Sequence, residues 1–90
     1  MAFARTVILE DAAREYLDEE ERKYPRLSEV YRALEWRIAR QPEAGYRIPN
    51  YTPARYLVKS LYRQPCACIL TLMYRFTESE VNIEFVRVEE

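Results

Sequence analysis

Four basic side chains and a tyrosine fall on the last three predicted strands of this 90-residue chain. Lys59 and Arg63 are four residues apart, so their side chains share one face of an extended strand. Arg75 and Arg87 come late in the next two strands, and Tyr74 precedes Arg75. If these strands pair, the cations form a groove that attracts an anion. The simpler alternative is that each cation lies at a strand edge or in solvent.

A second group of candidates lies in the segment 41–55, which contains three prolines and the only glycine. This segment carries Arg47, Tyr51 and Arg55, which are placed to line the rim of such a groove. Long loops inside small domains are often functional. The alternative is an extended segment that wraps the edge of the core over the protein surface.

A third group breaks the pattern of a predicted helix. Arg32, Trp36 and Arg40 follow one another at intervals of four residues, and Trp36 lies nearly opposite the apolar stripe. One interpretation is an exposed indole covered by arginine stems. The other is an anchor that binds a partner, because Trp and Arg dominate the energetics of protein interfaces.

The elements that must position these groups begin with a strand at 3–9, in which apolar residues alternate. Asp11 is the expected N-cap of a helix over Ala12–Lys23. A second helix is predicted over Leu27–Arg40, where apolar residues recur at helical spacing, and prolines end both helices. Two helices with so short a connection pack antiparallel as a hairpin.

The last third of the chain predicts an antiparallel meander of three strands, Tyr56–Arg63, Ala67–Thr77 and Val81–Val88. The segment 66–74 has no charge, which indicates a central strand covered on both faces. The chain is therefore predicted to be one α+β domain over residues 1–90, with element order β-α-α-β-β-β.

Charge is unevenly distributed along the chain, although the net charge is only −1. Residues 24–63 carry eight bases and three acids, between an acidic segment at 10–23 and a second one at 64–90. Such asymmetry produces a local basic patch on an acidic protein, or simply solvated helix faces.

The composition of the chain further limits which metal sites, disulfides and membrane segments it can have. Cys66 and Cys68 are too far apart along one strand for an unstrained disulfide, and the chain has no histidine. We therefore expect small buried thiols in a reducing compartment, with no metal site and no cofactor. The first residues are too short and polar for a signal peptide, and no apolar run approaches the roughly 20 residues of a membrane span. We expect a soluble cytoplasmic protein that does not bind membranes.

Three passages resemble a known family: RQPEAG at 40–45, ARYLVK at 54–59, and LMYRFTESEVNIEFVRV at 72–88. Together with the predicted element order, they are similar to the RelE/ParE toxin superfamily over almost the whole chain. The resemblance implies a toxin of a bacterial type II toxin–antitoxin pair, neutralised by a cognate antitoxin. Its target would be mRNA on the ribosome in the RelE branch and DNA gyrase in the ParE branch.

The resemblance also implies roles for the candidate residues, which without histidine fall to lysine, arginine and tyrosine in a metal-independent endoribonuclease. The expected catalytic residues are Lys59, Arg63, Tyr74, Arg75 and Arg87; the expected nucleic-acid contacts are Arg47, Tyr51 and Arg55; the expected partner contacts are Arg32, Trp36 and Arg40. The alternative is a non-catalytic interaction module on the same scaffold.

Overall fold

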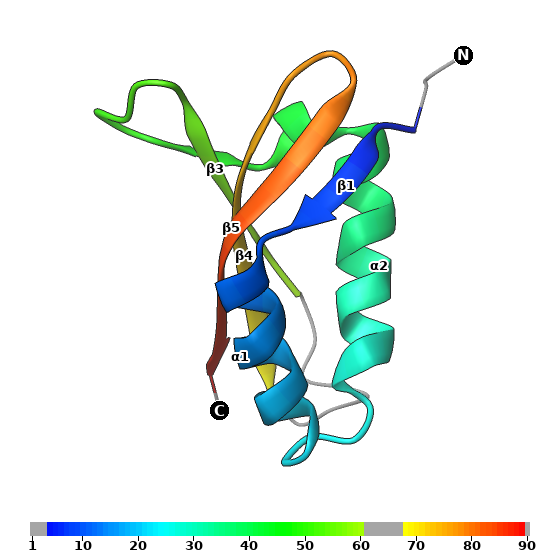
Figure 1. The fold of residues 1–90 in the computed structure, drawn as a ribbon. Helices are drawn as coiled ribbons and strands as arrows, with labels where there is room; N and C mark the ends of the chain where they lie inside the picture. Colours follow the sequence, from blue (N-terminus) through cyan, green and yellow to red (C-terminus); the bar gives the residue numbers. More distant parts are fainter. Residues whose placement is uncertain (1–3, 61–67, 90) are drawn as a thin grey trace.

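The computed structural model describes residues 4–60 and 68–89, which form a helix hairpin packed on one side of a five-stranded sheet (Figure 1). Strand β1 runs parallel to β5, and the other neighbours are antiparallel, in the order β1-β5-β4-β3-β2. No helix in the described ranges is long and apolar enough to cross a membrane. The elements are β1 (Thr6–Leu9), α1 (Asp11–Glu21), α2 (Leu27–Arg40), the 3-10 helix η1 (Pro42–Ala44), β2 (Tyr46–Ile48), β3 (Arg55–Lys59), β4 (Ile69–Phe76) and β5 (Glu80–Glu89).

The α+β class and the two predicted helices are confirmed, but the predicted strand count is wrong. The segment 41–55 is not a connection without regular structure, because it forms η1 and the additional strand β2. Strand β2 pairs with β3 and becomes one edge of the sheet. Three residues between a glycine and a proline are too short to give a periodic signal, so the sequence pattern did not reveal this strand.

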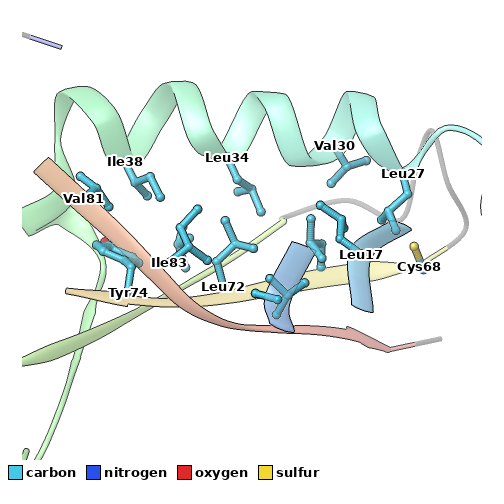
Figure 2. Close-up of a cluster of buried hydrophobic side chains, with 14 residues drawn as sticks. Leu17, Leu27, Val30, Leu34, Ile38, Cys68, Leu72, Tyr74, Val81 and Ile83 are labelled. Carbon is cyan, nitrogen blue, oxygen red and sulfur yellow. The ribbon is translucent and has the colours of Figure 1, made fainter. Parts of the chain in front are cut away.

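The helix hairpin covers one face of the sheet with the apolar stripe that its sequence predicted. Helix α2 occupies the predicted range and turns Leu27, Val30, Leu34 and Ile38 toward the strands (Figure 2). Helix α1 begins at Asp11 itself, so the predicted N-cap is wrong and Glu10 takes that place without a side-chain hydrogen bond.

Strand β4 is the centre of the sheet, as predicted, and pairs with β3 on one side and β5 on the other. Its core-facing residues join the side chains from both helices in one buried cluster. The fully buried members of that cluster are Leu27, Ile38, Cys68, Leu70, Leu72, Tyr74, Val81 and Ile83. The prediction that β4 is covered on both faces is only half right, because Ile69 and Met73 on its other face stay partly exposed.

A β-bulge between β4 and β5 sets which side chains of β5 reach the core. Met73 pairs with Phe85 while Tyr74 pairs with Ile83, so Glu84 is the extra residue. Val81 and Ile83 face the helices before the bulge, and Val86 faces them after it. The extra residue therefore shifts the alternation by one and turns Phe85 away from the core.

Tyr74 connects the centre of the sheet to the end of α2. Its hydroxyl donates a hydrogen bond of 2.6 Å to the carbonyl oxygen of Pro42, and its burial raises the pKa of the phenol to about 12. Gly45 passes directly over this hydroxyl. A Cβ at Gly45 would fall on the Tyr74 oxygen and lie 3.0 Å from the carbonyl oxygen of Leu57. Gly45 has an extended backbone that any residue can adopt. Glycine is therefore required here by the lack of room for a Cβ atom, and not by its φ angle.

We expect Gly45→Ala to destabilise the fold and to do so less when Tyr74 is already phenylalanine. Tyr74→Phe alone removes one buried hydrogen bond and leaves the Pro42 carbonyl with only the long 3.4 Å bond from the Gly45 N–H, at a cost of roughly 1–3 kcal/mol. In the double variant the added methyl no longer meets the hydroxyl. Denaturant unfolding of the four proteins should therefore give a coupling energy above about 0.5 kcal/mol. If the changes in the free energy of unfolding of the two single variants simply added up in the double variant, the contact between Gly45 and the Tyr74 hydroxyl would be contradicted.

Candidate functional site

The face of the sheet opposite the helices, called the open face below, carries four of the predicted site residues: Arg55, Lys59, Arg75 and Arg87. Within the described ranges, no helix or strand covers it (Figure 1). Residues that pair directly across neighbouring strands point to the same face, so the register arranges this surface in rows. Three such rows run across the strands, and each has a distinct chemistry.

The middle row is apolar and consists of Tyr46, Leu57, Met73 and Phe85, one from each of four neighbouring strands. Leu57 and Met73 are half-buried at the centre, whereas Tyr46 is 64% exposed and Phe85 52% exposed at the two ends. Three strand spacings separate these two rings, which is roughly 14 Å. The row thus presents two accessible aromatic rings with an apolar floor between them.

The second row consists of Lys59, Thr71 and Arg87, which pair across β3, β4 and β5. Both cations are exposed. The side chain of Lys59 has no hydrogen bond or ion pair with a described residue, and the Nε of Arg87 lies 3.6 Å from a carboxylate oxygen of Glu89. Thr71 is only 6% exposed, and its hydroxyl has no hydrogen-bond partner among residues 4–60 and 68–89. A buried hydroxyl in this state costs stability, and it lies between two positive charges.

The third group, on the other side of the apolar row, is an ion-pair cluster of Arg55, Glu84 and Arg75. One carboxylate oxygen of Glu84 binds the Nε of Arg55, and the other accepts a hydrogen bond of 3.1 Å from the Nε of Arg75. Arg55 also donates to the carbonyl oxygen of Pro53 at 2.8 Å. Because one carboxylate lies between two guanidinium groups, the cluster keeps a net positive charge. The carboxylate of Glu84 also holds both arginines in place.

The predicted catalytic residues are only partly brought together. Lys59 and Arg87 share a row, and Arg75 lies on the same face beyond the apolar row. Tyr74 points into the core on the opposite face, with its hydroxyl bonded to Pro42. Arg63 lies outside the described residues.

The three predicted nucleic-acid contacts do not gather on one surface. Arg55 lies on the open face, whereas Arg47 pairs with Tyr56, whose ring packs against the core, and so points to the helix side. Tyr51 is exposed in the connection between β2 and β3. The three predicted partner contacts lie together on α2, where the Arg40 guanidinium stacks 4.2 Å from the centroid of the exposed Trp36 ring and Arg32 is exposed.

Four residues of the open face were missed from the sequence: Tyr46, Thr71, Glu84 and Phe85. A signal for two of them exists in β5, where Val81 and Ile83 alternate in one phase and Val86 and Val88 in the other. That slip of phase indicates a bulge and places Glu84 and Phe85 outside the core. Tyr46 and Thr71 carry no comparable signal, because their exposure and hydrogen bonding depend on which strands are neighbours.

Comparisons with models of protein families, with curated proteins and with solved structures found no match to this chain.

We expect Thr71→Val to raise the free energy of unfolding by about 1 kcal/mol, because valine keeps the shape and removes a buried hydroxyl without a partner. Thr77→Val is the matched control. The Thr77 hydroxyl accepts hydrogen bonds from the backbone N–H groups of Ser79 at 3.3 Å and Glu80 at 3.2 Å, so its loss should lower stability. Urea unfolding measures both variants. If the Thr71→Val protein were less stable than the wild type, the Thr71 hydroxyl would have to make a stabilising interaction, which would contradict the absence of a hydrogen-bond partner described above.

Proposed function

We propose that this chain is the toxin-like subunit of a bacterial type II toxin–antitoxin pair of the RelE/ParE kind, and that its open face binds single-stranded RNA. The observation that carries the RNA target is the apolar row between two groups of cations. Exposed aromatic rings on a sheet stack against unpaired bases, and neighbouring cations hold the phosphates. Within the superfamily this favours mRNA over DNA gyrase as the target.

The family assignment is supported by how the resembling passages meet in space. The helix end with its Pro42 and Gly45, and the strand that ends at Tyr74, lie far apart in the chain. In the fold the Tyr74 hydroxyl binds the Pro42 carbonyl, and Gly45 leaves room for that hydroxyl. Two of the resembling passages therefore meet at one contact in the fold.

Cleavage of the bound RNA would depend on the row of Lys59, Thr71 and Arg87. Two exposed cations within one row can stabilise the negative charge that builds on a phosphate as the 2′-oxygen bonds to phosphorus and the bond to the 5′-oxygen breaks. The 2′-hydroxyl would lose its proton to water, and the leaving 5′-oxygen would take one from water. Arg55 and Arg75, held by Glu84, would bind a neighbouring phosphate. Tyr74 has no part in this proposal, because it lies on the other side of the sheet.

A second candidate function is a non-catalytic interaction module, whose expression would not harm the growth of the cell. Two observations favour it: the Tyr74 hydroxyl is committed to Pro42, and Arg75 is committed to Glu84. Only Lys59 and Arg87 of the described predicted catalytic residues are then available for chemistry. The two functions differ in whether RNA is cut, because the interaction module would bind a protein partner instead.

Induced expression in a bacterium separates the candidates. We expect the wild type to stop growth and to cut mRNA during translation, and the double variant Lys59→Gln/Arg87→Gln to restore growth. Arg22→Gln is the control, since Arg22 is an exposed cation just after α1 in the helix layer. Harmless expression of a folded wild type would favour the interaction module. Growth arrest with intact mRNA and inhibited supercoiling by gyrase would reject the RNA target.

Binding is measured separately with a labelled, unstructured RNA of about 12 nucleotides. We expect Phe85→Ala to weaken binding by roughly 5- to 150-fold, since stacking is worth about 1–3 kcal/mol per base. Trp36→Ala is a matched control, because it removes another exposed aromatic ring from the helix layer. Equal loss in the two variants, or no loss in Phe85→Ala, would place the RNA elsewhere.

A further inference from the structure

The outer surface of α2 is a second exposed site, distinct from the open face. Trp36 is 61% exposed there, and Arg32 and Arg40 lie one helical turn to either side of it. These three residues are called the Trp36 surface below. The apolar stripe of α2 faces the sheet (Figure 2), so this surface takes no part in holding the core together.

The Trp36 surface is preorganised by Arg40. The Arg40 guanidinium lies 4.2 Å from the centroid of the indole ring and donates a hydrogen bond of 3.1 Å to the carbonyl oxygen of Trp36. One face of the indole is therefore already covered by a cation. An arginine held in this way loses little side-chain freedom when it binds a carboxylate, because its orientation is already fixed.

Neither acid of α2 forms an ion pair with Arg32 or Arg40. Glu29 accepts two hydrogen bonds from Arg26, at 2.6 and 3.3 Å, and Glu35 interacts with the hydroxyl of Tyr31. The side chain of Arg32 makes no hydrogen bond or ion pair with any described residue, and it is exposed. Two arginines that form no ion pair with a carboxylate in the described part of the chain thus flank an exposed apolar ring.

We propose that the Trp36 surface binds an acidic peptide segment of another protein, in which carboxylates pair with Arg32 and Arg40 and an apolar side chain packs on the free side of Trp36. Charge complementarity supports this partner: arginine forks bind carboxylates in a bidentate manner, and Trp and Arg are the most frequent interface anchors. Helix α1, with six acids and one arginine, repels the same segment and so confines it to α2.

A nucleic acid fits this surface less well than an acidic peptide. Arg40 occupies one face of the indole, which leaves a single face for base stacking, and no second exposed aromatic residue follows on the helix within the described residues. The open face offers two free rings and more cations for that purpose. The proposal does not depend on the RNA-binding function, because the two surfaces lie on opposite layers of the fold.

The test uses the fluorescence of Trp36, which is the only tryptophan of the chain. The intact protein is titrated with a synthetic peptide of about 14 residues composed of Glu, Asp and Leu, and with the same peptide carrying Gln and Asn instead. We expect a saturable change with the acidic peptide only. Affinity should fall at least tenfold in Arg32→Gln/Arg40→Gln and be unchanged in Phe85→Ala, which alters the open face.

Three outcomes would overturn the proposal. The first is equal binding of the neutral peptide, or no saturable change with either peptide. The second is tighter binding of an oligouridine than of the acidic peptide at the Trp36 surface, which would assign the surface to nucleic acid. The third is self-association of the chain alone, measured by sedimentation, if the double arginine variant abolishes it. This result would assign the surface to the acidic α1 of a second copy. Calorimetry with Trp36→Ala, which should not bind, checks the optical result.

Discussion

The extra residue at Glu84 determines what both faces of this sheet can do. Without it, the alternation of β5 would carry Phe85 into the core after Val81 and Ile83 and would turn Val86 outward. The bulge keeps valines and isoleucine against the helices along the whole strand. It also directs Glu84 and Phe85 together to the open face. The carboxylate then orders two arginines, and the ring ends the apolar row, so one inserted residue supplies both the electrostatic and the stacking part of the proposed RNA site.

The distribution of charge along the chain becomes a distribution in space. The acidic segment forms α1, and the basic middle of the chain supplies α2, β2 and β3. A protein with a net charge of −1 can therefore present two separate cationic surfaces, one on the helix layer and one on the open face. The two surfaces differ in design: the open face spreads cations around an apolar row, whereas α2 places them around a single tryptophan.

Much of the fold follows from local patterns in the sequence. The apolar stripe of α2 and the charge-free run that becomes β4 are strong signals, and the helix and the central strand lie where these patterns place them. Strand β2 escaped prediction because three residues hold no period, and its existence depends on pairing with β3. The site was harder to predict. The structure places Lys59 and Arg87 on one face, but their relation to Thr71, and the burial of Tyr74, depend on strand register, which residue types do not fix.

The central claim is that single-stranded RNA lies across the open face, along the row from Tyr46 to Phe85. The most direct measurement is a map of backbone amide NMR shifts during titration with a short unstructured RNA. The account predicts that the largest shifts fall on β2 to β5, at Tyr46, Met73, Phe85 and Arg87, while α1 and the outer surface of α2 stay unchanged. Shifts confined to the helices, or none at all with a folded protein, would contradict it.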